Sequence, residues 1–120
     1  MVTSNKIIRI LLDNRHIGTH GDVRHTIIAY TYVGKQLIYE LNSYSHCCKS
    51  SRQAGHWFDH AETRLLQTVK PKVIYITGIT QGRKIMSTTL PCAKCMKILK
   101  QEGVKKIVCN YINKLTIIKL

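Results

Sequence analysis

The amino-acid sequence predicts an α/β fold in which one mixed five-stranded sheet carries helices on its faces. Segments with helical spacing of apolar residues alternate with short runs of β-branched and aromatic residues, in the order α-β-β-α-β-α-β-β. The chain has 120 residues, of which 44% are hydrophobic, and this suffices for one modest core. We therefore expect a single domain over residues 1–120.

The first half of the chain is expected to form a helix and a hairpin. Apolar residues at i, i+1, i+4 and i+5 from Ile7 predict a helix over residues 4–15. Two runs rich in β-formers, 27–33 and 37–41, predict strands joined by a turn at Gly34-Lys35. Residues 42–56 have no periodicity and are expected to form a loop.

The second half is expected to alternate helices and strands. Leu65, Leu66 and Val69 predict a helix over 59–69, which Pro71 ends. The apolar run 73–77 is typical of a central strand, and 78–83 is expected to be a turn or irregular.

A third helix should begin at Pro91, since proline suits a first helical position, and should end at Gly103. Strands are expected over 104–109 and 115–120. The five residues between them are too few for a parallel crossover, so we expect these last two strands to be antiparallel.

The overall charge indicates a polyanionic partner. Lys and Arg number 19 against six acids, which gives a net charge of +13, and a field of this sign attracts nucleic acid. No segment has the apolar length of a membrane span, and the first residues have no signal-peptide pattern. Five cysteines, an odd number with two in a CxxC, favour metal ligation in a reducing cytoplasm over a disulfide framework.

Two short motifs carry candidate chemistry: His60-Ala61-Glu62 and Pro91-Cys92-Ala93-Lys94-Cys95. Cys92 and Cys95 share one face at an expected helix start, where the helix dipole should favour thiolates. With His60 they supply three ligands for Zn²⁺ and leave the fourth tetrahedral position to water, as catalytic zinc sites do. Glu62 is then the candidate proton carrier.

Two other interpretations of the cysteines remain open. A closed zinc site that only stabilises the fold would need a fourth ligand, which Cys109 or the Cys47-Cys48 pair could supply. A redox CxxC would also lie at a helix start, but it has no use for His60 and Glu62.

The order H-x-E then P-C-x-x-C resembles the cytidine and deoxycytidylate deaminase superfamily of zinc-dependent enzymes. The resemblance extends from the first hairpin onward and implies that superfamily's mixed five-stranded sheet. Residues 87–92 and 103–108 look like small bacteriophage deaminases, whereas an antiparallel final hairpin looks more like nucleoside deaminases and toxin deaminases. Relatives often form dimers or larger assemblies, so the resemblance also allows a homo-oligomer.

The resemblance implies hydrolysis of cytosine to uracil, with attack by zinc-bound hydroxide and Glu62 as proton shuttle. The expected substrate is a nucleotide or a single-stranded nucleic acid. Deamination of adenine in nucleic acid and a non-catalytic, zinc-stabilised nucleic-acid-binding module are the alternatives.

Four residues are candidates for substrate contact. Asn42 matches an asparagine that binds the sugar in many relatives, although asparagine is also a common turn residue. Trp57 could stack on the base or pack in the core. Ala61 and Pro91 adjoin the zinc motifs, where backbone N–H groups near Ala61 and Cys92 could bind the pyrimidine carbonyl.

Overall fold

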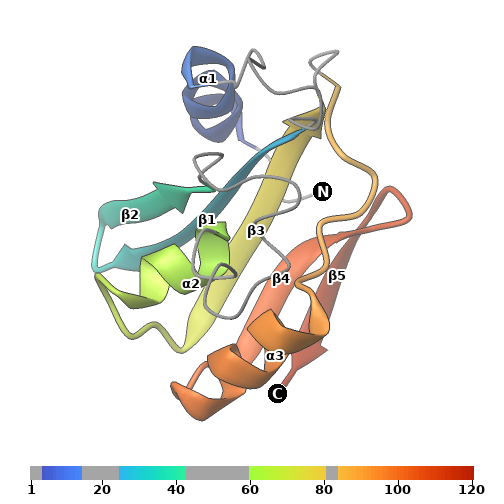
Figure 1. Cartoon of the computed structure of the whole chain (residues 1–120). Helices are drawn as coiled ribbons and strands as arrows, with labels where there is room; N and C mark the ends of the chain where they lie inside the picture. Colours follow the sequence, from blue (N-terminus) through green and yellow to red (C-terminus); the bar gives the residue numbers. More distant parts are fainter. Residues whose placement is uncertain (1–3, 15–24, 43–59, 81–83) are drawn as a thin grey trace, which may run out of the picture.

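The computed structural model describes residues 4–14, 25–42, 60–80 and 84–120, which form a mixed five-stranded sheet and three α-helices (Figure 1). In chain order the elements are α1 (Asn5–Asp13), β1 (His25–Val33), β2 (Gln36–Leu41), α2 (Ala61–Leu66), β3 (Val73–Thr80), α3 (Ala93–Gln101), β4 (Lys106–Tyr111) and β5 (Lys114–Lys119). The sheet order is β2-β1-β3-β4-β5, with β3 and β4 parallel and the other neighbours antiparallel. The predicted fold class and the antiparallel last pair are confirmed.

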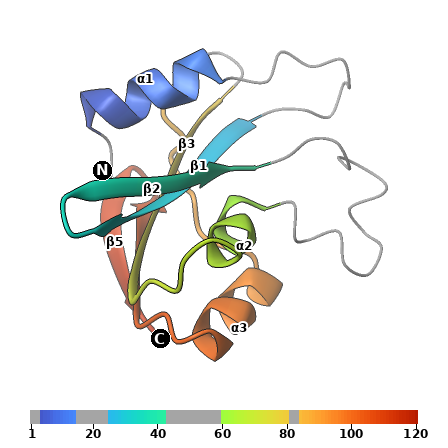
Figure 2. The same cartoon turned by 90° about the vertical axis from the view of Figure 1, so that its left-hand side faces the viewer.

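The helices lie on both faces of this sheet, and each face has its own apolar cluster. Helices α2 and α3 cover one face and α1 lies on the other (Figure 2). The cluster under α2 and α3 includes Leu65, Leu99 and Ile107, whereas Ile7 and Leu11 of α1 pack with residues of the opposite face. No helix in the described part of the chain is long and apolar enough to span a membrane.

The parallel pair of strands determines where the helices begin. Helix α2 leads into β3 and α3 leads into β4, so each helix runs back along the strand that follows it. The first residues of both helices therefore lie near the carboxyl ends of β3 and β4. In open α/β sheets, this edge is where ligand sites usually form.

The predicted end of β3 was wrong, because the strand continues through Gly78 to Thr80. Strand β1 pairs with this extension, in a register that runs from Tyr30↔Tyr75 to His25↔Thr80. A Cβ at residue 78 would lie 2.8 Å from the Thr26 carbonyl oxygen. Glycine therefore permits a close approach of two backbones here and does not mark a turn.

The predicted helix bounds were too wide. Helix α2 ends at Leu66, after which Gln67 and Thr68 donate to carbonyls three residues back in a tighter turn. Helix α3 begins at Ala93 and not at Pro91, because Cys92 keeps an extended backbone with φ −68° and ψ 167° as the N-cap. Both differences arise in the first and last turns, where helices fray or tighten.

The connection between the last two strands is shorter than predicted. Strands β4 and β5 are joined by Ile112 and Asn113, whose φ angles of 50° and 63° fit a two-residue type I′ hairpin turn. Asn110 and Tyr111, assigned to a loop from the sequence, belong to β4. Asn110 is buried there because its side chain has partners inside the protein.

Candidate metal centre

Three side chains from the two predicted motifs converge at the carboxyl edge of β3 and β4. The ligating atoms of His60, Cys92 and Cys95 all lie within 4.8 Å of one another. His60 Nδ1 is 3.2 Å from Cys95 Sγ and 3.8 Å from Cys92 Sγ. Cys95 is buried, His60 is half-buried and Cys92 is exposed, so the group is open to solvent on the Cys92 side.

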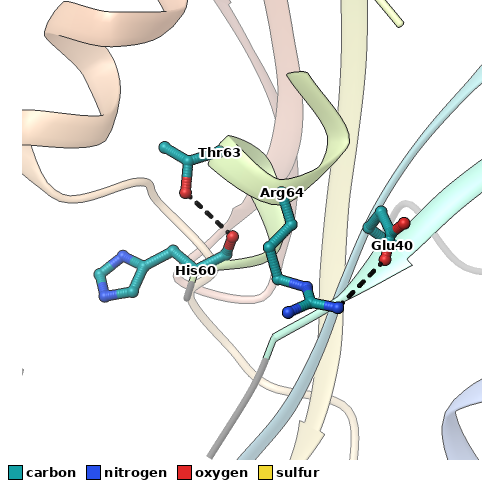
Figure 3. A network of polar contacts seen from close by, with 4 residues as sticks. All are labelled: Glu40, His60, Thr63 and Arg64. Atoms are coloured by element: carbon teal, nitrogen blue, oxygen red, sulfur yellow. Dashed lines mark hydrogen bonds and ion pairs between the residues drawn. The ribbon is translucent and has the colours of Figure 1, made fainter. Parts of the chain in front are cut away.

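His60 is held by its backbone at the start of α2. Its carbonyl oxygen accepts hydrogen bonds from Arg64 N and from Thr63 Oγ1, both at 3.0 Å. Figure 3 shows the imidazole ring pointing away from α2, while Arg64 on the other side contacts Glu40 of β2 at 3.6 Å. This ion pair links α2 to β2, and the imidazole ring of His60 remains available to a ligand (Figure 3).

The two thiols are placed by the first turn of α3. The Cys92 carbonyl accepts from Met96 N at 2.9 Å, and Cys92 Sγ accepts from Cys95 N at 3.5 Å. Because Cys92 precedes the helix and Cys95 lies one turn on, both sulfur atoms face His60. Pro91 is buried just before them.

The donor set and its spacing fit a tetrahedral metal ion. Usual Zn–N and Zn–S lengths imply nitrogen–sulfur separations of about 3.6 Å in a tetrahedral site. The two nitrogen–sulfur distances here, 3.2 and 3.8 Å, lie on either side of that value. Imidazole and thiolate are ligands of zinc and of other transition metals, and three protein ligands would leave one position of a tetrahedral ion open.

Glu62 lies beside this group without belonging to it. The residue is only 5% exposed, and its carboxyl interacts with the Cys95 thiol and with His60. Burial raises the pKa of the Glu62 carboxyl, and its own backbone N–H, His60 and Cys95 oppose this only in part. A buried carboxyl with a raised pKa suits a group that both takes and returns a proton.

The expected lowering of thiol pKa at the helix start was wrong for Cys95. Burial, followed by the charge of the nearby Glu62, raises the pKa of this thiol well above its usual range. The helix N-terminus is too weak to offset the loss of solvent around a fully buried sulfur. A metal cation at the site would reverse the balance by binding the thiolate.

A buried hydrogen-bond network anchors the segment before Cys92. Sequence reasoning missed this network. Thr89 Oγ1 donates to the Ile76 carbonyl at 2.9 Å and accepts from Asn110 N at 3.0 Å. Asn110 Nδ2 donates to Thr77 Oγ1 at 3.1 Å and to the Met86 carbonyl at 3.2 Å. Thr89 therefore bridges β3 and β4 three residues before the first cysteine, and its only sequence signal was its place next to the motif.

The remaining predicted substrate contacts have different outcomes. Asn42 Oδ1 accepts from Ile27 N at 2.9 Å and extends the β1–β2 ladder, as a structural asparagine would. Its role toward a sugar stays a prediction. Ala61 and Pro91 are both buried next to the metal ligands. Trp57 lies outside the described residues.

The fourth-ligand alternatives find no support among the described residues. Cys109 is buried in the cluster under α2 and α3, and it does not belong to the group of ligating atoms. Cys47 and Cys48 lie outside the residues that the structure describes. Within the described chain, the site therefore offers three candidate ligands.

Comparison with known proteins gives no further assignment. No protein-family model, curated protein or solved structure matches this chain significantly. The site geometry and the sequence motifs must therefore carry any conclusion on function.

Proposed function

We propose that this protein is a zinc-dependent hydrolytic deaminase that converts cytosine to uracil in a nucleotide or a single-stranded nucleic acid. The observation that carries the proposal is the position of Glu62. Its carboxyl is buried against Cys95 and His60, although the three other side chains already suffice to hold a metal ion. A purely structural metal site has no need of a buried carboxyl at this place.

His60, Cys92 and Cys95 would hold the zinc ion. When bound, zinc supplies a water molecule acidic enough to act as a nucleophile near neutral pH. The exposure of Cys92 leaves one side of the group accessible to a substrate. The three described cysteines are free thiols, which suits a reducing compartment such as the cytoplasm.

Glu62 carries the protons in this mechanism. Its carboxylate accepts a proton from the attacking water while a carbon–oxygen bond forms at carbon 4 of cytosine, and it delivers that proton to ring nitrogen 3. Glu62 then takes the second proton of the added water and passes it to the amino group. The carbon–nitrogen bond breaks, ammonia leaves, and carbon 4 keeps the oxygen as a carbonyl.

The net charge of the chain supports an anionic substrate but does not distinguish a free nucleotide from a nucleic acid. A net charge of +13 attracts free nucleotides and polynucleotides alike. Deamination of adenine and binding without catalysis are therefore included as outcomes of the test below.

The test compares the wild type with Glu62→Gln, each loaded with zinc and with metal content measured. Glu102→Gln is the matched control, because Glu102 is an exposed carboxylate at the C-cap of α3 that pairs with Lys70 at 2.8 Å. Each protein is offered dCMP, cytidine, cytosine-containing and adenine-containing single strands, and released ammonia and the base product are measured. We expect Glu62→Gln to keep one zinc and lose at least a hundredfold in rate, whereas Glu102→Gln keeps both zinc and rate.

The same assay separates the alternatives. Wild-type protein that holds zinc but releases no ammonia from any of these substrates would contradict the proposal and favour a non-catalytic module. If product forms only from the adenine-containing strands, the substrate base is adenine and not cytosine. Activity on single strands should fall steeply with salt because bound counterions are released, whereas activity on dCMP alone would point to a free-nucleotide enzyme.

A further inference from the structure

The sheet face that carries α1 has an aromatic row that the helix leaves partly exposed. The strand registers place Tyr39, Tyr30, Tyr75, Val108 and Ile117 side by side across all five strands. Helix α1 packs over this face with Ile7 and Leu11, but Tyr39 remains 40% exposed and Ile117 55% exposed. Figure 2 shows the helix on this side of the sheet, opposite α2 and α3.

A fourth tyrosine, Tyr32, lies one row away on the same face. Tyr32 is 52% exposed, and its ring meets the edge of Tyr75 at a centroid distance of 6.2 Å. Tyr75 in turn stacks on Tyr30 at 5.1 Å with an interplanar angle of 14°. Tyr32 therefore projects from a cluster of tyrosine rings that contact one another. We call Tyr32, Tyr39, Tyr75 and Ile117 the tyrosine face.

Two lysines of like charge border the tyrosine face. Lys106 and Lys119 are direct partners in the antiparallel β4–β5 ladder, so their side chains leave the sheet on the same side as Val108 and Ile117. Both are exposed, and neither belongs to an ion pair recorded among the described residues. Like charges directly opposite each other in a sheet are destabilising, and a bound anion relieves that cost.

The surface continues into an open hollow at the end of the sheet away from the metal ligands. This hollow of about 470 Å³ is lined by Tyr32 and Val73 together with Lys70 and Lys72. Lys72 adds positive charge next to the exposed aromatic ring, whereas Lys70 is paired with Glu102 at 2.8 Å. Aromatic rings beside a basic groove are the combination with which proteins bind single-stranded nucleic acids.

We propose that the tyrosine face, with Lys106 and Lys119, is a binding surface for single-stranded nucleic acid on the opposite side of the sheet from the metal centre. Bases stack on Tyr32 and Tyr39, and phosphates lie against the lysine pair and the adjacent hollow. The surface does not depend on the metal chemistry, and it gives the chain a means of holding a polynucleotide away from the metal centre.

Charge favours this occupant over a second copy of the chain. A two-fold contact through the tyrosine face would bring two Lys106–Lys119 pairs to one interface, between chains that each carry a net charge of +13. A polyanion meets the same surface with opposite charge. A duplex hides the faces of its bases inside the stack, so a single strand fits the exposed tyrosine rings better.

The test measures binding of fluorescently labelled oligothymidylate and oligouridylate of about 20 nucleotides to the zinc-loaded protein. Thymine and uracil carry no amino group, so no deamination interferes. The test variant is Lys106→Gln with Lys119→Gln. The matched control is Lys97→Gln with Lys100→Gln, two exposed lysines one turn apart on α3 at the opposite face.

We expect the Lys106/Lys119 variant to bind at least tenfold more weakly in low salt, with a log–log salt slope reduced by about 1.4 for two lost phosphate contacts. The α3 control should change affinity less than twofold. Tyr32→Leu, which keeps an apolar side chain but no ring, should weaken binding about fivefold or more. Removing the like-charge pair should leave the melting temperature unchanged or higher, so weaker binding cannot be attributed to unfolding.

Three results would overturn the proposal. The first is an equal loss in both double variants, which would mean that only total charge matters. The second is a duplex of the same length that binds as tightly as the single strand, with no effect of Tyr32→Leu. The third is sedimentation showing a dimer that the Tyr32 variant dissociates, which would assign the tyrosine face to a second copy.

Discussion

Thr89→Val tests whether the hydrogen bonds of Thr89 near the candidate metal site stabilise the folded protein by linking β3 to β4. Valine has nearly the shape of threonine but neither donates nor accepts, so the Ile76 carbonyl and the Asn110 N–H each lose the partner that Thr89 provides at 2.9 and 3.0 Å. A buried group that loses its partner costs about 1–3 kcal/mol. The two together should lower the free energy of unfolding by about 2–6 kcal/mol. With a urea dependence of about 2 kcal/mol per molar, the unfolding midpoint should fall by about 1–3 M.

The measurement is urea unfolding of metal-free protein in a chelator, followed by circular dichroism. Thr88→Val is the matched control, because the neighbouring Thr88 Oγ1 makes a single exposed contact with Ile112 N at 3.3 Å. We expect this control to shift the midpoint by less than about 0.5 M. Equal, small shifts in the two variants would refute the reasoning that Thr89 bridges β3 and β4. A second readout is zinc affinity, which should fall in Thr89→Val because the segment leading to Cys92 loses its anchor.

Three further predictions concern packing, titration and the metal. Gly78→Ala should destabilise the protein by about 1–3 kcal/mol, since its Cβ would lie 2.8 Å from the Thr26 carbonyl oxygen; a melting temperature within a degree of wild type would contradict this. Burial raises the pKa of Cys109, so the thiol ionises at lower pH in the unfolded chain than in the folded protein, and the free energy of unfolding should fall as pH rises above about 8.5. Urea unfolding of the wild type and of Cys109→Val at several pH values checks this. The fall that is due to Cys109 should be absent from the variant. Zinc at about a hundred times its dissociation constant should stabilise the wild type by about 2.7 kcal/mol, as measured by calorimetry. In the same scan, zinc should stabilise Cys92→Ser only a little. Equal stabilisation of the two proteins would exclude Cys92 as a ligand.

Most of the fold could be read from local patterns. Apolar spacing from Ile7 and the apolar run from Val73 gave the correct element types, because each pattern reflects burial on one side or on both. The antiparallel last pair followed from the length of its connection alone. The errors in the strands fell at Gly78 and Asn110, where a residue common in turns lies inside a strand because of its neighbours in space.

The sequence by itself determined the order of the elements and the identity of the candidate ligands, since ligand chemistry depends on residue type and on short spacing such as that of Cys92 and Cys95. Only the tertiary structure decided that His60 meets both thiols, that Glu62 is buried beside them, and that Thr89 supports the segment leading to them. It also decided that Lys106 and Lys119 share a face with the exposed tyrosines. These relations join residues far apart in the chain through sheet register and parallel pairing, which local composition does not encode.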